Sequence, residues 1–250
     1  RDDGYYDMDF DNLEKVCDDK CRIFILCNPH NPAGMCWKKE TLQKLADFCY
    51  EHHLLVISDE IHCDMAIFGH KHIPFATVSE KARENSITFQ APTKTFNIAG
   101  IISSYAIIPN ADIRKKFYGW IKANELDEAN IFAPIATIAA FTKGEEWRKS
   151  MLTYIEDNVR FIEDYCKKNI PQIHPLRPQA SFLVWLNCRE LNLDHKDLLD
   201  LFIDKAHLAL NDGEMFGQGG EGFMRMNIAT PRSVIKQALD QLATAVNNLK

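Results

Sequence analysis

Two short segments, each directly after a predicted strand, constrain the fold and the chemistry of this chain more than any other sequence feature. The motif Ser58-Asp-Glu-Ile-His62 follows one apolar run, and residues 90–100, which contain Lys94, follow another. In an α/β sheet, ligands bind at the carboxyl ends of the parallel strands. We therefore expect Asp59 and Lys94 to lie at the same edge of a sheet, where a ligand can reach both.

The first half of the chain alternates patterns typical of strands and of helices. Residues 22–27 form a buried-strand pattern, and residues 38–52 carry apolar side chains at helical spacing. Further strands are expected at residues 54–57, 86–89 and 104–108. This alternation indicates a mostly parallel sheet with flanking helices, so the predicted fold class is α/β. The apolar face of the first predicted helix consists of Leu42, Leu45, Ala46 and Cys49.

Three helices are expected in the middle of the chain. The first starts after Asn110, which can cap it, and ends near Lys122. A helix-like run at residues 131–142 follows, and a long amphipathic helix starts at Glu145. The side chains that the first of these helices is predicted to bury are Ile113, Phe117, Trp120 and Ile121.

The last third of the chain has a different sequence pattern. Short strands are expected at residues 182–186, 207–210 and 223–228, between helices. Thr230 and Pro231 can supply the N-cap and the first residue of the last helix. These patterns predict a small α+β domain at the C-terminal end of the chain.

Length and composition describe an ordinary globular protein of one or two domains, with 250 residues, 46% hydrophobic and 26% charged. We expect residues 1–143 to be part of a large domain and residues 144–250 to form the small domain. A net charge of −6 gives no reason to expect nucleic acid or an anionic membrane as a partner. The longest apolar run, residues 131–141, is too short to cross a bilayer.

The eight cysteines form no CxxC pair, which favours free thiols in a cytoplasmic protein over a disulfide or metal framework. His70 and His72 have a spacing seen in metal sites, but the sequence offers no further ligand set beside them. No metal site is therefore predicted.

A lysine and an aspartate at one sheet edge match the needs of pyridoxal phosphate (PLP). PLP requires an amine that forms a Schiff base and a carboxylate that keeps its pyridinium nitrogen protonated. The residues from Asp59 to His62 could also be a DExH ATPase box, but the phosphate loop that such a box requires is missing from the sequence. A third motif, Asn28-Pro-His-Asn-Pro-Ala-Gly34, holds Asn31 in a turn made rigid by two prolines.

Together with Gly69-His-Lys-His-Ile-Pro-Phe75, these motifs resemble the fold-type I PLP enzymes of the class I/II aminotransferase superfamily. The residues of these motifs are similar to those of the MalY/PatB-type cystathionine β-lyases, and the similarity extends from about Tyr6 to the C-terminus. The resemblance implies that Lys94 binds PLP and moves the proton at the substrate Cα. It also implies that Asp59 pairs with the ring nitrogen. His62 stands where lyase-type members have a histidine near the cofactor, although it could instead be a core residue.

The resemblance assigns further roles around the cofactor. Asn31 would donate to its phenolic oxygen, and Arg225 would bind the substrate α-carboxylate through two parallel hydrogen bonds. Ala91 and Ile102 stand where many relatives have phosphate-binding side chains, which leaves Thr93 as the expected phosphate donor in this chain. The Gly-rich residues at 217–222 precede a strand and are expected to form a loop rather than a phosphate cradle.

The same resemblance implies a partial PLP-transferase large domain, lacking an upstream third that would hold the phosphate cradle and the ring-stacking aromatic residue. We expect a homodimer in the full-length form and weak PLP binding by this chain alone. The favoured function is a C–S β-lyase acting on cystathionine or a related cysteine S-conjugate. An aminotransferase with the same residues is the alternative, and a non-catalytic aminotransferase-like domain of a transcription regulator is a third interpretation.

Overall fold

A computed structural model describes residues 5–249 of the protein, and its chain divides into two compact units. The first, called here the parallel-sheet unit, comprises residues 7–30 and 36–150. Of the described residues, the second unit, called the antiparallel-sheet unit, comprises residues 5–6, 31–35 and 151–249. The division falls inside a long helix, whereas the sequence places a domain boundary just before that helix.

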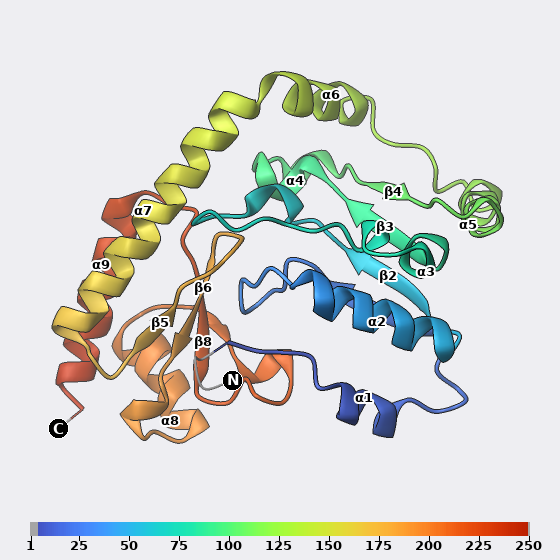
Figure 1. Cartoon of the computed structure of the whole chain (residues 1–250). Helices are drawn as coiled ribbons and strands as arrows, with labels where there is room; N and C mark the ends of the chain where they lie inside the picture. Colours follow the sequence, from blue (N-terminus) through green and yellow to red (C-terminus); the bar gives the residue numbers. More distant parts are fainter. Residues whose placement is uncertain (1–4, 250) are drawn as a thin grey trace. The chain divides into compact units, whose positions relative to one another are not determined.

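The parallel-sheet unit contains a four-stranded sheet in the order β1-β2-β3-β4 (Figure 1). The first three strands are parallel to one another and β4 runs antiparallel to β3. The α/β fold class predicted from the sequence is therefore confirmed. The strands are β1 (Ile23–Cys27), β2 (Leu55–Asp59), β3 (Ser86–Gln90) and β4 (Tyr105–Ile107).

Helices of this unit include α2, whose predicted apolar face is confirmed because Leu42, Leu45 and Cys49 are completely buried. The segment between β2 and β3 adds Phe75 and Met65 to the same core. The helices are α1 (Phe10–Val16), α2 (Lys39–Glu51), α3 (Glu80–Glu84), α4 (Pro92–Thr95), α5 (Ala111–Ala123), α6 (Ala133–Lys143) and the start of α7 (Glu145–Asn169).

Helix α5 begins as predicted, because the Asn110 side chain accepts hydrogen bonds from the backbone N–H groups of Asp112 and Ile113. The prediction that this helix buries an apolar stripe is wrong: none of its residues is buried, and Trp120 is 63% exposed. The reason is that its apolar face overlooks an open cavity of about 530 Å³ beside the sheet rather than packed side chains. The cavity is lined by Arg22, His53, Leu55, Asn85, Ile87, Ile113, Lys116, Phe117 and Trp120.

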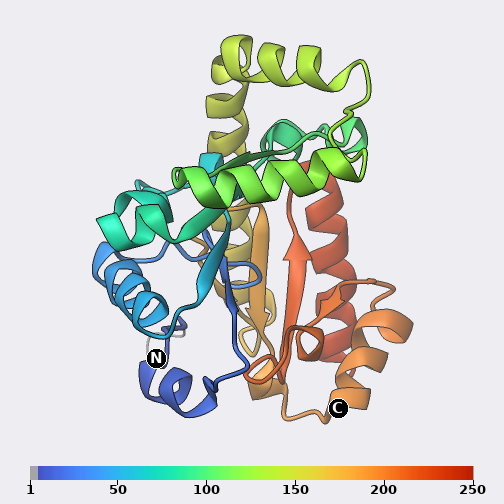
Figure 2. The ribbon, with the colours of Figure 1, turned by 90° about the vertical axis from the view of Figure 1, so that its right-hand side faces the viewer.

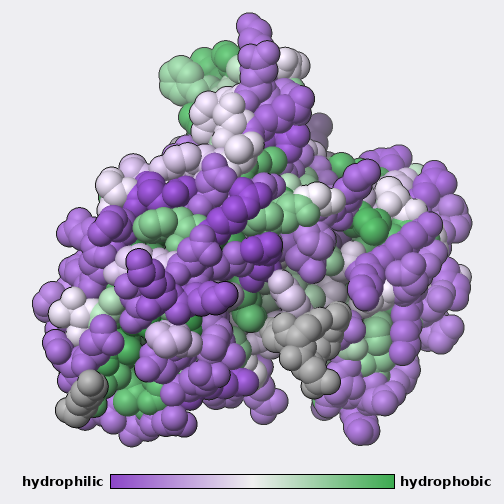
Figure 3. Space-filling model, turned by 60° about the vertical axis from the view of Figure 1, so that its left-hand side comes forward, coloured by the Kyte–Doolittle hydropathy of each residue, from purple (hydrophilic) through white to green (hydrophobic). Residues whose placement is uncertain are grey.

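Helix α6 confirms the helix predicted at residues 131–142, with Pro134 in its first turn. Between Ala133 and Thr142 its sequence has no charged residue, and apolar side chains lie exposed on it, as the green atoms at the top of Figure 3 show. A helix that is apolar on every side is typical of a buried element. The exposed apolar side chains on α6 and just before it are Ile131, Phe132, Ile135, Ile138 and Phe141.

The antiparallel-sheet unit has a sheet of order β5-β6-β8-β7, in which all neighbours are antiparallel. Helices α7 and α9 lie side by side beside it, joined by the hydrogen bond from Tyr165 to Asp240 (Figures 1 and 2). Its core includes Trp185, Val159 and Ile235. The elements are β5 (His174–Leu176), β6 (Leu183–Asn187), β7 (Asn211–Asp212), β8 (Phe223–Asn227), α8 (His195–Asp200) and α9 (Arg232–Asn247).

Two local predictions in this unit are wrong. Residues 207–210 are not a strand, because His207 has a φ of 55°, in the left-handed region that interrupts an extended chain. The last helix begins at Arg232, with Pro231 rather than Thr230 at its N-cap. The Arg232 N–H donates instead to the Tyr154 hydroxyl on α7, at 2.8 Å. Across residues 5–249, no helix is both long and apolar enough to cross a membrane.

Candidate active site

The carboxyl ends of β2 and β3 bring Asp59 and the segment that carries Lys94 to one edge of the parallel sheet. Asp59 is the last residue of β2 and is in register with Cys27 of β1 and Phe89 of β3. Its carbonyl oxygen accepts from the Asn28 N–H at 2.9 Å, and the next N–H, that of Glu60, donates to the Phe89 carbonyl at 2.9 Å. The backbone is thus held on both sides of Asp59.

The Asp59 side chain is exposed at the end of its strand. Its Oδ1 accepts one hydrogen bond, from the Ile61 N–H at 3.2 Å. No lysine, arginine or histidine among residues 5–249 forms an ion pair with it. A carboxylate in this state can accept a cationic partner such as a protonated ring nitrogen.

Lys94 lies on α4, a single helical turn that begins two residues after the end of β3. Pro92 occupies the start of this turn, where its fixed φ favours a helix and its missing N–H costs nothing. Thr93 and Thr95 are buried on either side of Lys94, whereas the Lys94 side chain is exposed. The local fold therefore directs the amine away from the core at the edge where Asp59 lies.

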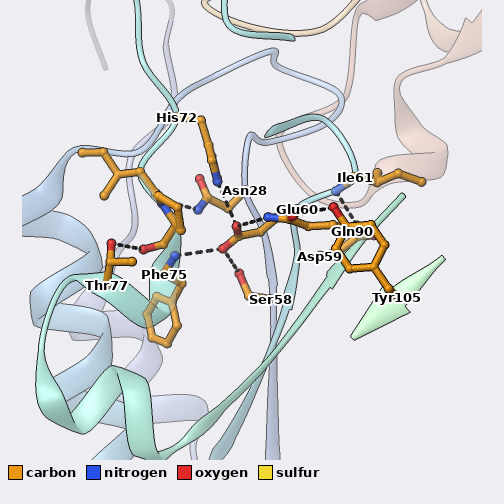
Figure 4. A network of polar contacts seen from close by, with 12 residues as sticks. Asn28, Ser58, Asp59, Glu60, Ile61, His72, Phe75, Thr77, Gln90 and Tyr105 are labelled. Atoms are coloured by element: carbon orange, nitrogen blue, oxygen red, sulfur yellow. Dashed lines mark hydrogen bonds and ion pairs between the residues drawn. The ribbon is translucent and has the colours of Figure 1, made fainter. Parts of the chain in front are cut away.

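A buried carboxylate, that of Glu60, organises the residues behind this edge (Figure 4). Its Oε1 accepts from the Ser58 hydroxyl at 2.9 Å and from the Phe75 N–H at 2.8 Å. Its Oε2 lies 2.8 Å from His72 Nε2 and accepts from Gln90 Nε2 at 3.3 Å. One side chain thus connects the ends of β2 and β3 with the loop that contains His72 and Phe75.

Two further contacts extend this network (Figure 4). The Tyr105 hydroxyl donates to Gln90 Oε1 at 3.0 Å, and Asn28 Nδ2 donates to the Ile73 carbonyl at 2.9 Å. Burial raises the pKa of Tyr105 to about 12, which keeps its hydroxyl protonated as a donor. The network was not predicted from the sequence, because each of its long-range contacts depends on which strands and loops become neighbours.

The remaining residues predicted for this unit have distinct environments. His62 is buried at the start of the 3₁₀ turn Cys63–Met65, and its role toward a cofactor stays a prediction. Thr93 is also buried, and its role as a phosphate donor is likewise still a prediction. Ile102 is 82% exposed and has a φ of 52°, a conformation that is costly for a β-branched residue.

Asn31 and Arg225 meet in the antiparallel-sheet unit. Arg225, on β8, donates from Nη1 to Asn31 Oδ1 at 2.8 Å and from Nη2 to Asn211 Oδ1 at 2.7 Å. Its guanidinium also lies 4.7 Å from the centre of the Phe216 ring. Because arginine can only donate, the amide oxygen of Asn31 must face Arg225, which fixes the orientation of that amide. No motif in the sequence signalled Asn211 or Phe216.

Gly34 holds the turn that carries Asn31. It has a φ of 64°, and a Cβ there would lie 2.7 Å from the Cβ of Pro178. Its carbonyl oxygen accepts from the N–H groups of Gln179 and Ala180 at 2.7 and 3.0 Å. Only glycine combines this backbone conformation with so close an approach.

Comparisons with known proteins place the chain in a family. The sequence model for aminotransferase class I and II matches residues 2–242. Cystathionine beta-lyase PatB of Bacillus subtilis (strain 168) is 41% identical over 246 residues, covering 98% of this chain and 64% of PatB. Protein MalY of Escherichia coli (strain K12) is 33% identical over 250 residues, covering 99% of this chain and 63% of MalY.

A solved structure agrees with these relatives. Cystalysin from Treponema denticola, whose crystal structure contains a pyridoxal 5'-phosphate cofactor, matches with a TM-score of 0.94 and 38% identity. The match covers 99% of this chain and 63% of cystalysin. The chain thus spans slightly less than two thirds of the length of these three proteins. With an aspartate at the end of β2, a lysine on the turn after the adjacent parallel strand β3 and a family match over nearly its whole length, this chain belongs to the aminotransferase class I and II family.

Proposed function

We propose that this protein is a PLP-dependent C–S β-lyase that cleaves cystathionine, or a related S-substituted cysteine, into pyruvate, ammonia and a thiol. The proposal rests on the placement of Asp59 at the end of β2 and of Lys94 on the helical turn that follows the adjacent parallel strand β3. The similarity to PatB, at 41% identity, supports the β-lyase reaction over the other reactions of the family.

The donor set of this edge fits PLP. An exposed primary amine on Lys94 can bind the cofactor covalently, and the unpaired carboxylate of Asp59 can hold a protonated ring nitrogen. Asn31 and His62 would contact the phenolic side of the ring, and Thr93 would contribute to phosphate binding. When bound, PLP supplies an electron sink that stabilises negative charge at the substrate Cα.

The residues of this chain then have defined tasks. Arg225 binds the α-carboxylate of the amino acid and so orients its Cα–H bond. The Lys94 amine removes the Cα proton, and the electron pair released at Cα expels the thiolate from Cβ. A thiolate leaves readily, so no additional acid has to protonate it. Water then completes the conversion of the remaining three-carbon unit into pyruvate and ammonia.

The alternative function is an aminotransferase, which the family match also supports. Both reactions begin with removal of the Cα proton by Lys94. In an aminotransferase the amino group would remain with the enzyme, so a 2-oxo acid would be required to complete each cycle. The two functions therefore differ in their need for a second substrate.

The test is pyruvate release from L-cystathionine, measured with and without added 2-oxoglutarate. We expect pyruvate and thiol in equal amounts without the 2-oxo acid, and no stimulation when it is added. Turnover that requires 2-oxoglutarate and produces glutamate would establish the aminotransferase instead. PLP binding without turnover under either condition would support the third interpretation, a non-catalytic ligand-binding domain.

A further inference from the structure

We propose that Asn211 is a positioning residue, which holds Arg225 ready for the substrate α-carboxylate without neutralising its charge. The inference rests on the proposed function, because it concerns how the amino-acid substrate is held. Asn211 lies on β7, the edge strand that pairs with β8, and outside the sequence motifs named above.

The hydrogen bonds of Arg225 show which of its donors remain for a ligand. A guanidinium has five N–H donors. One on Nη1 is directed to Asn31 and one on Nη2 to Asn211, while Nε is buried and has no hydrogen-bond partner within residues 5–249. One N–H therefore remains on each of the two terminal nitrogens. The guanidinium thus keeps two donors for the two oxygens of a carboxylate.

The charge of Arg225 is not compensated by its neighbours. Both hydrogen-bond partners are neutral amides, and none of the carboxylates in the described chain forms an ion pair with it. The guanidinium is partly removed from water, since its Nε is buried, and this burial lowers the pKa of Arg225. A partly buried cation without a counter-ion is costly, and an incoming carboxylate relieves that cost.

The sequence of β7 keeps a nearby acid away from this cation. Asn211 is in register with Arg225, whereas the next residue, Asp212, is in register with Met224. Successive side chains of a strand point to opposite faces. Consistent with this, Asp212 Oδ2 lies 3.4 Å from His195 Nε2 rather than beside Arg225. A neutral residue at 211 and an acid at 212 thus leave the guanidinium charge free for substrate.

This arrangement predicts a specific kind of selectivity. Ligands with a free α-carboxylate should gain affinity from Arg225, and the gain should depend on residue 211 being neutral and able to accept a hydrogen bond. A carboxylate at position 211 would form an internal ion pair with Arg225 and compete with substrate. An alanine would leave the guanidinium less firmly oriented.

The experiment compares two ligands with the full-length, PLP-loaded protein by titrating the cofactor absorbance. L-alanine has the α-amino and α-carboxylate groups but no leaving group at Cβ, and ethylamine is the same molecule without the carboxylate. The preference for L-alanine is the dissociation constant of ethylamine divided by that of L-alanine. We expect this ratio to fall about tenfold in Asn211→Ala, as for one lost hydrogen bond to a charged group. In the charge-swap variant Asn211→Asp/Asp212→Asn it should fall roughly a hundredfold, at constant net charge.

Asp212→Asn alone is the matched control, and its preference for L-alanine should equal that of the wild type. With L-cystathionine, the same Asn211 variants should raise KM much more than they lower kcat. Unchanged ligand preference in both Asn211 variants, in proteins that keep the wild-type melting temperature and cofactor spectrum, would overturn the role of Asn211. If the wild-type protein shows no absorbance response to L-alanine but releases pyruvate from L-cystathionine, the role of Asn211 fails alone; if it also releases no pyruvate, the proposed function fails with it.

Discussion

His72 Nε2 lies 2.8 Å from the Glu60 carboxylate, although the two side chains are only 8% and 0% exposed. The pair links the end of β2 to a loop 12 residues further along the chain. Because Glu60 directly follows Asp59, this contact supports the backbone at which the proposed pyridinium partner is held. His70 and His72 have a spacing seen in metal sites, but their environments differ. His70 is exposed, whereas His72 contacts Glu60.

The first prediction concerns this pair. His72→Phe should lower the free energy of unfolding by about 3 kcal/mol, because it leaves a buried carboxylate without one of its donors. Urea denaturation measures this change. His70→Phe, at an exposed position in the same loop, should change stability by less than about 0.5 kcal/mol. Equal effects of the two substitutions would contradict the structural role of the Glu60–His72 contact.

A second prediction separates catalysis from cofactor binding at Asp59. Asp59→Asn should reduce kcat far more than it weakens PLP binding, because an amide cannot stabilise a positive charge on the ring nitrogen. The lost charge-assisted interaction is worth on the order of 1.5–3 kcal/mol. Asp47→Asn is the control, since Asp47 is an exposed aspartate paired with Lys81. An Asp59→Asn protein with wild-type kcat would show that Asp59 does not partner the ring nitrogen.

Two glycine substitutions should have effects of opposite sign. Gly34→Ala should destabilise the protein by about 1–3 kcal/mol, because of its positive φ and the close approach of Pro178. Gly119→Ala, inside α5 where nothing lies within 4 Å of the added methyl group, should stabilise it by up to about 1 kcal/mol. Thermal unfolding of both variants measures the difference. A loss of stability in Gly119→Ala would contradict the open space that surrounds this position of α5.

Cys63, close to the candidate site, should be unreactive at ordinary pH. Burial, and then the nearby charges of Asp64 and Glu60, raise its pKa to about 12. Because the thiolate is the reactive form, its alkylation by iodoacetamide should be slow at pH 8 and should keep rising about tenfold per pH unit beyond pH 9. Mass spectrometry of the native protein measures this rate. A rate that levels off near pH 9 would contradict the burial of this thiol.

The sequence predicted those parts of the site that depend on local order along the chain. Asp59 and Lys94 follow strand patterns directly, so their placement at strand ends needed only the α/β assignment. The apolar spacing of α5 identified the face that carries Ile113, Phe117 and Trp120, but it could not show that this face lines an open cavity instead of being buried. The Glu60 network and the contact between Asn211 and Arg225 join residues far apart in sequence, so no local pattern signals them.

The central claim is that Lys94 binds PLP covalently. Borohydride reduction of the full-length, PLP-loaded protein, followed by proteolysis and mass spectrometry, tests it most directly. We predict a pyridoxyl group on the peptide that contains Lys94, none on the exposed Lys71 of the neighbouring loop, and no labelled peptide in Lys94→Ala. A pyridoxyl group on a different lysine in the wild-type protein, or one that persists with full activity in Lys94→Ala, would contradict the account.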